Sequence, residues 1–274
     1  MERALVVGTG AVAQALVPAL TARGVAVALR SRSPERAARL AAATGTSVQE
    51  GALRGGTLLL AVPDRALAEV AQASAANGDA PDVALHLSGF HDAAVLQPLA
   101  DAGVATGFAH PLGSFPRGGP PIPTRLTWCC GGATPAAAEA AMRLVQVLEG
   151  RPLPLGPGPH AKAAYHAAAS LVAGGSAALL QLAEELAGPE VQEPEALRQG
   201  LCDLLASMLA NARATGPAAA LTGPAARGDE AVVAGHLEVM GTEAAQVYRS
   251  LLEPMRRMAA ARAEAESSGR PGAE

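Results

Sequence analysis

The fold is decided near the N-terminus by the stretch Ala4-Leu5-Val6-Val7-Gly8-Thr9-Gly10-Ala11-Val12-Ala13. Four apolar residues predict a buried strand, and the pattern Gly-x-Gly-x-x-Ala after it is typical of a turn into a helix. Gly8 would allow the tight turn, Gly10 would let the backbone approach a pyrophosphate, and Ala13 would keep the helix close to the sheet. We therefore expect a dinucleotide site at Gly8, Thr9, Gly10, Ala11 and Val12, with an ordinary glycine turn as the alternative.

Outward from this turn, short apolar runs alternate with segments of helical length as far as residue 155. Such runs are apolar on both faces, as in a parallel sheet that is covered by helices on both sides. The sequence therefore predicts an α/β fold, a doubly wound Rossmann parallel sheet over residues 1–155. The expected strands are residues 4–7, 25–29, 57–62, 83–87, 104–108 and 125–130. Residues 117–123 are expected to form a loop, and residues 152–159 a linker between domains.

The second part of the chain predicts helices only. A smaller all-α domain for substrate binding and dimerisation is expected over residues 156–263, followed by a disordered tail over 264–274. Residues 161–187 predict one long helix, and leucines and methionines between 197 and 209 have the spacing of a second buried stripe. A domain of this size cannot bury two such stripes alone, so we expect a homodimer formed through the helical domain.

Composition narrows the partners and the compartment. The net charge is −4, and the 21 Lys and Arg are spread along the chain, so neither nucleic acid nor a membrane surface is expected as a partner. No signal peptide and no apolar run of about 20 residues stands out, which favours the cytoplasm. The three cysteines have no zinc-like spacing, so we expect reduced thiols and no metal.

The residues after the second expected strand indicate which dinucleotide is bound. NAD-binding proteins place an acid there for the ribose hydroxyls, whereas this chain has Arg30-Ser31-Arg32-Ser33, with Arg36 a turn later. Guanidinium and hydroxyl groups hold a 2′-phosphate that an acid would repel. We expect NADP(H), with Arg30, Ser31 and Arg32 at the phosphate; a solvated basic loop is the alternative. Val62 and Pro63 are expected beside the ribose and nicotinamide, unless they merely end a strand.

The succession of motifs resembles a family of Rossmann-like proteins whose C-terminal half is a domain of unknown function. The resemblance covers residues 3–260 and is carried by Gly8-x-Gly10, Ala61-Val62-Pro63-Asp64, His86-Leu87-Ser88-Gly89, His110-Pro111-Leu112, Ser114-Phe115, Lys162-Ala163-Ala164-Tyr165-His166-Ala167-Ala168 and Leu221-Thr222-Gly223-Pro224-Ala225-Ala226-Arg227-Gly228-Asp229. This family belongs with the 6-phosphogluconate dehydrogenase-like reductases, which include pyrroline-5-carboxylate reductase, ketopantoate reductase and prephenate dehydrogenase. The resemblance implies an NADP-linked reductase with a helical second domain that often dimerises.

Lys162 and His166 are four residues apart and share one face of the predicted helix. In related hydroxyacid dehydrogenases a Lys-x-x-x-Asn pair lies here, and its lysine is the general acid. His166 replaces that asparagine, so the resemblance leaves the proton donor open between Lys162, His166 and His110, whose His-Pro resembles that of prephenate dehydrogenases. The alternative is a lysine on the helix surface and histidines that serve the fold.

Three further residues are candidates for binding the substrate. Ser88 ends a strand and could donate to the substrate or to the nicotinamide carboxamide. Thr222 and Arg227 lie in a glycine-rich turn, where free N–H groups and a guanidinium could hold a carboxylate. Asp229 could instead cap the next helix and pair with Arg227.

Together these residues favour an NADPH-dependent reductase of a small carboxylate-bearing carbonyl compound. A 2-oxo acid such as 2-dehydropantoate (ketopantoate) is the preferred substrate, because a lysine or histidine can protonate the developing alkoxide. Two alternatives stay open. One is reduction of a cyclic imine of the pyrroline-5-carboxylate type, and the other is a non-catalytic NADP(H)-binding sensor or scaffold.

Overall fold

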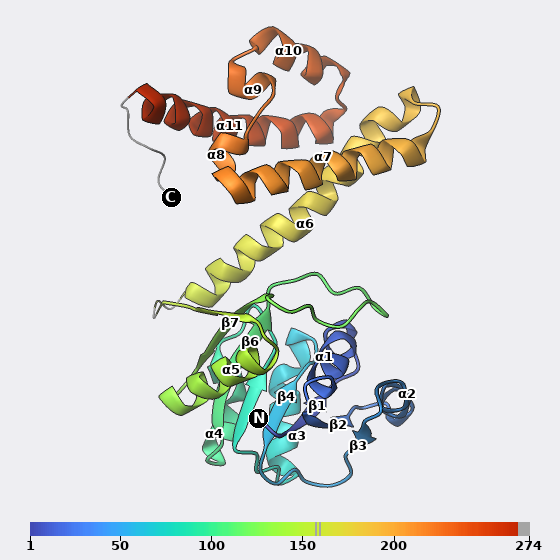
Figure 1. Cartoon of the computed structure of the whole chain (residues 1–274), viewed down its shortest axis with the longest axis vertical. Helices are drawn as coiled ribbons and strands as arrows, with labels where there is room; N and C mark the ends of the chain where they lie inside the picture. Colours follow the sequence, from blue (N-terminus) through green and yellow to red (C-terminus); the bar gives the residue numbers. More distant parts are fainter. Residues whose placement is uncertain (157, 159, 268–274) are drawn as a thin grey trace. The chain divides into compact units, whose positions relative to one another are not determined.

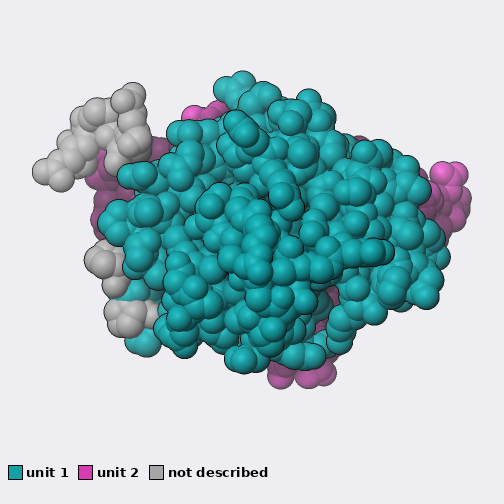
Figure 2. All heavy atoms as spheres, turned by 90° about the horizontal axis from the view of Figure 1, so that it is seen from below, with its two compact units in different colours: residues 1–171 teal, residues 172–274 magenta. Residues whose placement is uncertain are grey.

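The N-terminal part of the chain is built on one sheet, in the strand order β3-β2-β1-β4-β5-β6-β7-β8 (Figure 1). The structure is a computed structural model that describes residues 1–156, 158 and 160–267. It divides into two compact units, residues 1–171 (unit 1) and residues 172–274 (unit 2), which Figure 2 colours separately. The strands are β1 Arg3–Val7, β2 Ala26–Arg30, β3 Ser47–Val48, β4 Thr57–Leu60, β5 Val83–His86, β6 Ala105–Pro111, β7 Thr127–Gly132 and β8 Arg151–Pro154.

All strand pairs are parallel except β6 with β7, which is antiparallel. The doubly wound α/β class is confirmed, and the expectation of a purely parallel sheet is corrected at this pair. The physical reason lies in the connection, because residues 112–126 contain no helix among the described residues. A parallel crossover needs a long connection, usually a helix, whereas an antiparallel return does not.

Strand β8 corrects the expected linker at residues 152–159. Arg151–Pro154 pairs parallel with β7 and ends the order of strands in the sheet, although two of its four residues are prolines. A proline cannot donate to a strand ladder, so it is tolerated on an edge strand, where one side of the backbone has no neighbour. Pro152 and Pro154 therefore belong to the last strand of the sheet, whereas Pro157 and Pro159 of the expected linker lie outside the described residues.

Helices cover both faces of the sheet, and each face has its own apolar layer. Ala4 and Val6 of β1 face the layer that contains α1, whereas Leu5 and Val7 face the layer that contains α3 and α4. This alternation explains why the four buried positions of the strand, residues 4–7, are all apolar. The helices of this part are α1 Ala11–Thr21, α2 Pro34–Thr44, α3 Leu67–Ala76, α4 Gln97–Asp101 and α5 Pro135–Val147, with short 3₁₀ turns at Asp64–Ala66 and Ala93–Leu96.

The second half is helical, as expected. Its elements are α6 Ala161–Ala187, a 3₁₀ turn at Gly188–Glu190, α7 Pro194–Thr215, α8 Pro217–Ala220, α9 Pro224–Arg227, α10 Glu230–Val239 and α11 Thr242–Ser267. Helix α6 begins in unit 1 and continues into unit 2, so the units meet inside this helix. The domain limits 1–155 and 156–263 stay a prediction. Of the predicted disordered tail, residues 264–267 belong to α11, and residues 268–274 lie outside the described part.

The expected buried stripe on α7 is not buried in the single chain. None of the described residues of α7 is buried, and Leu204 and Leu209 are 67 % and 52 % exposed. Among the described residues no helix buries that stripe, so the spacing predicted the helix, and burial of the stripe would need a further surface. Unit 2 has instead a small core around Ala225, Val233 and Leu252.

Helix α6 has an unusual composition as well as an exposed surface. The segment Ala161–Glu190 is long and apolar enough to cross a membrane by these two criteria alone, and none of its most apolar window is buried. A long helix was expected over residues 161–187, but an apolar run long enough to cross a membrane was not. A single helix of this kind is a weak indication, because helices from the interiors of water-soluble proteins meet the same criteria.

Candidate functional site

Gly8 and Gly10 of the first turn differ in whether the fold requires a glycine at that position. Gly8 has a φ of +127°, and an added Cβ would lie 2.2 Å from the carbonyl oxygen of Ala61, so no other residue fits. Gly10 precedes α1 with a φ of −74°, and an added Cβ would meet no atom within 4 Å. The fold itself therefore requires Gly8 but not Gly10. The open space beside Gly10, at the start of a helix, fits a phosphate group that approaches the backbone.

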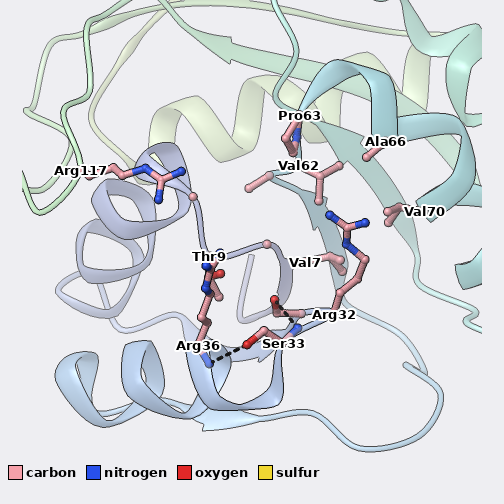
Figure 3. A pocket seen from close by; sticks show the side chains of 14 residues that line it. Val7, Thr9, Arg32, Ser33, Arg36, Val62, Pro63, Ala66, Val70 and Arg117 are labelled. Atoms are coloured by element: carbon pink, nitrogen blue, oxygen red, sulfur yellow. Dashed lines mark hydrogen bonds between the residues drawn. The ribbon is translucent and has the colours of Figure 1, made fainter.

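A cavity of about 420 Å³ opens beside this turn (Figure 3). Of the predicted cofactor residues, Gly8, Thr9, Gly10, Ser31, Arg32, Val62 and Pro63 line it, together with Val7, Ser33, Arg36, Ala61, Ala66, Val70 and Arg117. Ala11, Val12 and Arg30 do not line it. Its walls thus combine apolar residues from the end of β4 and from α3 with arginines and serines from the end of β2 and from α2. Such a lining suits an adenosine that carries a phosphate.

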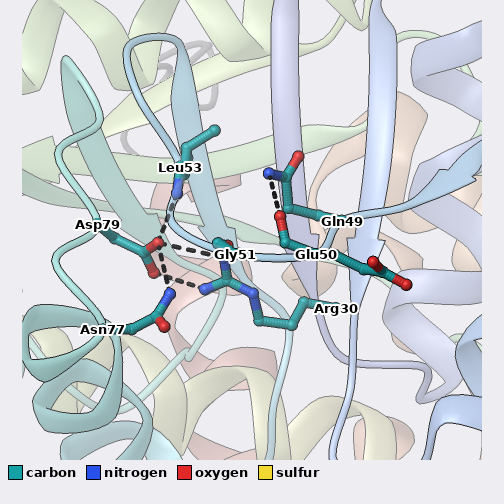
Figure 4. A network of polar contacts seen from close by, with 7 residues as sticks. All are labelled: Arg30, Gln49, Glu50, Gly51, Leu53, Asn77 and Asp79. Atoms are coloured by element: carbon teal, nitrogen blue, oxygen red, sulfur yellow. Dashed lines mark hydrogen bonds and ion pairs between the residues drawn. The ribbon is translucent and has the colours of Figure 1, made fainter.

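Arg30 is occupied elsewhere (Figure 4). Its guanidinium forms an ion pair with the fully buried carboxylate of Asp79 and donates to the carbonyl of Gly51. Burial would raise the pKa of the Asp79 carboxyl, but hydrogen bonds from Arg30 and from the Leu53 N–H outweigh it, so this pKa lies below its usual value. Arg30 thus neutralises a buried acid in this structure, and its expected contact with the 2′-phosphate stays a prediction.

The predicted catalytic residues lie at the carboxyl ends of β5 and β6, beside the start of α6. The ammonium of Lys162 is buried, donates to the carbonyl of Ser88 at 2.9 Å, and lies 4.2 Å from the centre of the Phe108 ring. Burial lowers the pKa of Lys162. The carbonyl and the ring face hold a cation that has lost most of its water.

His110 is joined to a residue that the sequence analysis did not select. Its Nδ1 shares a 2.8 Å hydrogen bond with the hydroxyl of Tyr165, which lies one turn after Lys162 on α6. Burial, and then the charge of Lys162, lowers the pKa of His110 to about 4, whereas burial raises the pKa of Tyr165. At neutral pH the imidazole is therefore uncharged and the phenol keeps its proton.

His166 directly follows Tyr165 on α6 and belongs to the same cluster of side chains. Its Nδ1 is buried and has no hydrogen-bond partner among the described residues. A Cβ on Gly89 would lie 2.3 Å from this atom and 2.9 Å from Nε2 of His110. Both ring nitrogens therefore converge on Gly89, and only a glycine leaves room for them.

His86 and Ser88 build the turn that carries Gly89. Nδ1 of His86 accepts from the N–H of Ser88, so its Nε2–H donates to the carbonyl of Asp92. This fixes the tautomer, and burial lowers the pKa of His86 to about 4. The hydroxyl of Ser88 accepts from the N–H groups of Phe90 and His91, while its carbonyl holds Lys162. Ser88 therefore lies in the cluster but shapes it mainly through the turn.

The structure thus brings together Lys162, His166, His110 and Ser88, and adds Tyr165. One signal in the sequence was overlooked: Lys162 is the only lysine, and all other members of the 21 Lys and Arg are arginine. An arginine does not give up its proton near neutral pH, whereas a buried lysine can. Lys162 is therefore the one Lys or Arg side chain of the sequence that could act as a proton donor.

Thr222 and Arg227 lie in unit 2, beside α9. Arg227 forms an ion pair with Asp229 at 2.8 Å, and its side chain is largely exposed. Asp229 directly precedes α10, but its side chain makes no capping hydrogen bond. The pairing between Arg227 and Asp229 is thus present, and a role in holding a carboxylate stays a prediction. Among the described residues, no group of three or more His, Cys, Asp or Glu could hold a metal.

Two family models match different parts of the chain. Residues 4–83 match the family described as NADP oxidoreductase coenzyme F420-dependent, and residues 127–254 match a domain of unknown function, DUF2520. No curated protein matches the chain. The N-terminal match confirms the expected Rossmann domain, the NADP(H) cofactor and the oxidoreductase class, and the second match confirms the resemblance of the C-terminal half.

Three solved structures share the fold over nearly their whole length. A candidate NADP oxidoreductase from Bacteroides fragilis is 19 % identical, with 93 % of this chain and 98 % of that chain covered and a TM-score of 0.74. A protein from Thermotoga maritima is 21 % identical, with coverages of 94 % and 99 % and a TM-score of 0.73. An imine reductase from Streptomyces aurantiacus is 18 % identical, with both coverages 93 % and a TM-score of 0.62. At these identities the likeness shows the fold.

Proposed function

We propose that this chain, an NADP(H)-binding oxidoreductase, reduces the carbonyl group of a small 2-oxo acid, with 2-dehydropantoate as the first candidate. The observation that carries the proposal is the buried Lys162 at the carboxyl ends of β5 and β6. Strands β1, β2, β4, β5 and β6 are parallel, so the dinucleotide cavity and the Lys162 cluster lie at the same edge of the sheet. Ligands of doubly wound folds bind at this edge.

Bound NADPH would supply a hydride to the carbonyl carbon, and the protein would supply the proton that the oxygen needs. Lys162 is suited to this task because it is cationic, shielded from water and held by Ser88 with two ammonium hydrogens left over. Its positive charge would stabilise the developing alkoxide, and its lowered pKa would ease transfer of the proton. His166, with its unpartnered Nδ1, and the pair formed by His110 and Tyr165 would orient the carbonyl or return the proton to Lys162.

Thr222 and Arg227 of unit 2 are proposed to hold a carboxylate group. A guanidinium holds a carboxylate through two parallel hydrogen bonds. In this structure the guanidinium of Arg227 forms an ion pair with Asp229. Substrate binding would therefore have to compete with an exposed ion pair, which contributes little to stability.

One test compares two changes at the sole lysine. Lys162→Arg keeps a charge and a donor but has no proton to give near neutral pH, whereas Lys162→Met removes both charge and proton. A proton donor predicts that both variants lose turnover of 2-dehydropantoate, measured as NADPH consumption. A purely electrostatic role predicts that Lys162→Arg keeps a large part of it. Full activity in both variants would move the catalytic assignment to His110 and Tyr165.

Reduction of a cyclic imine is the second candidate function. The observation in its favour is Tyr165, because a neutral phenol beside a neutral imidazole can protonate an imine nitrogen without a neighbouring alkoxide stabiliser. The buried cation at Lys162 opposes it, because a positive group repels a protonated imine. Cyclic imines in the same NADPH assay decide between the two. If neither class is reduced while NADPH still binds, the sensor or scaffold function applies.

The exposed stripes of the helical half support a homodimer. Leu171 and Val172 on α6 are 76 % and 65 % exposed, and Leu204 on α7 is exposed to a similar extent. Apolar patches of this kind on the surface of a chain indicate an interface. A second copy of the chain would cover them with the same surface in a twofold arrangement. Light scattering at micromolar concentration tests this, and a monomer would contradict it.

A cytoplasmic location remains part of the proposal. The described cysteines are free, and Cys129 and Cys130 are buried beside each other on β7. Adjacent thiols without a disulfide are usual in a reducing compartment.

A further inference from the structure

The loop between β6 and β7, residues 112–126, is tied to the first turn of the dinucleotide site. Gln14 of α1 makes two hydrogen bonds, one from its amide nitrogen to the carbonyl of Thr9 and one from the Gly118 N–H to its amide oxygen, each 3.0 Å long. The N–H of Ile122 donates to the carbonyl of Ala15, and the Ile122 side chain is buried. The tip of the loop is thus fixed against α1.

These anchors hold Arg117 at the wall of the dinucleotide cavity. Arg117 is on the loop, Arg32 is on the turn after β2, and Arg36 is on α2, so three separate elements supply the cations (Figure 3). Arg117 also lines a second cavity of about 340 Å³, together with Thr9, Gln14, Arg36, Arg39 and Leu40. The two cavities share Thr9, Arg36 and Arg117, so they adjoin.

The second cavity is strongly cationic. Its lining contains three arginines and no carboxylate. Glu35 lies on the exposed start of α2, where a hydrogen bond from Ser33, and to a smaller extent the charge of Arg39, lower its pKa. Three guanidinium groups around one space repel each other, and a phosphate between them would remove this repulsion. The site is therefore complementary to a phosphate group.

We propose that Arg117 and Arg39 complete the site for the 2′-phosphate of NADP(H), and that the loop after β6 thereby distinguishes NADP(H) from NAD(H). The pyrophosphate belongs at Gly10 and the start of α1, where backbone N–H groups are free. The 2′-phosphate belongs at the end of β2, and Arg36 is the residue that both cavities share on that side. The inference concerns the cofactor, and it does not depend on the proposed carbonyl substrate.

The experiment is a fluorescence titration of the full chain with NADPH and with NADH. Arg117→Gln and Arg39→Gln remove one charge each, and Arg143→Gln on α5 is the matched control, since Arg143 is exposed and lines neither cavity. The expected result for Arg117→Gln is a Kd for NADPH raised about tenfold or more, with the Kd for NADH unchanged. Arg39→Gln should act in the same direction, and Arg143→Gln should change neither value. Tenfold corresponds to about 1.4 kcal/mol.

Three results would overturn the inference. Equal losses for NADPH and NADH would assign Arg117 to the pyrophosphate or to the fold, and no loss in either would remove it from the site. The third arm uses inorganic phosphate as the probe. Competition with NADPH but not with NADH supports a single site for the 2′-phosphate. If phosphate instead raises the Tm of the NADPH-saturated protein, and Arg117→Gln abolishes this, the second cavity holds a free anion.

Discussion

Replacing Gly8 and Gly10 separately by alanine should damage two different properties of the protein. Gly8→Ala introduces a Cβ 2.2 Å from the carbonyl oxygen of Ala61, in a backbone conformation with φ of +127°. The unfavourable conformation costs roughly 1–3 kcal/mol, and forcing apart two packed strands costs about as much again. We expect the free energy of unfolding to fall by about 3 kcal/mol or more, which lowers the Tm by roughly 6 °C or more.

Gly10→Ala should instead leave stability nearly unchanged. Its backbone conformation is ordinary and its Cβ would meet no atom within 4 Å. A small loss from a poorer helix start and a small gain from a stiffer unfolded chain, each below about 1 kcal/mol, oppose each other. The new methyl group would occupy the space of the pyrophosphate, so the Kd values of NADPH and NADH should rise together, by about tenfold or more for each lost hydrogen bond to the phosphate.

Thermal unfolding and fluorescence titration of both variants provide the assay. Normal dinucleotide affinity in Gly10→Ala would refute the reasoning, because the open space would then not be the phosphate site. A Gly10→Ala protein that unfolds as readily as Gly8→Ala would also refute it, because the fold alone would then require both glycines.

Three further outcomes follow from the same structure. Arg30→Ala should lower the free energy of unfolding in urea by about 3–5 kcal/mol, because it leaves the buried Asp79 carboxylate without its partner. The same variant should change NADPH affinity little. A large loss of affinity without loss of stability would instead support the expected role of Arg30 at the phosphate. His86 and His110 have pKa values of about 4 in the folded chain, so the unfolded chain binds more protons between pH 6.5 and 4. The free energy of unfolding should therefore fall as the pH is lowered through this range, by up to about 1.4 kcal/mol per pH unit for each histidine. A urea midpoint that does not change between pH 7 and 5 would contradict this. Leu204→Glu should shift the chain toward a monomer in light scattering, whereas Glu238→Ala, a change at an exposed position of α10, should not; an unchanged dimer would place the interface elsewhere.

The parts of the fold that follow local rules could be predicted from the sequence. Residues 4–7 of the strand before Gly8 are all apolar because helices cover both faces of the sheet, and this pattern predicts a parallel core. The direction of β7 and the existence of β8 were not predicted. The direction of β7 depends on its connection to β6, which contains no helix among the described residues. The existence of β8 depends on its place at the edge of the sheet, where prolines are tolerated.

The candidate site was predictable only where one segment determines it. The glycine turn and the Lys162–His166 spacing lie within single motifs. The ion pair of Arg30 was not predictable, because its partner, Asp79, lies on a distant segment of the chain. Arg117 was not selected because long-range hydrogen bonds, from Gly118 to Gln14 and from Ile122 to Ala15, bring its loop to the dinucleotide cavity. Long-range pairing therefore decides which arginine is free.

The pKa of Lys162 most directly tests the proposal that this chain is a carbonyl reductase with Lys162 as the proton donor. Because Lys162 is the only lysine, reductive methylation with ¹³C-formaldehyde labels one side chain besides the N-terminus, and NMR can follow its titration. If Lys162 is the proton donor, its pKa lies below the usual value near 10.4. In Lys162→Met the kcat for 2-oxo acid reduction should fall by roughly 10²–10⁴-fold, while the Kd of NADPH stays the same. A normal pKa together with full kcat in Lys162→Met would contradict it.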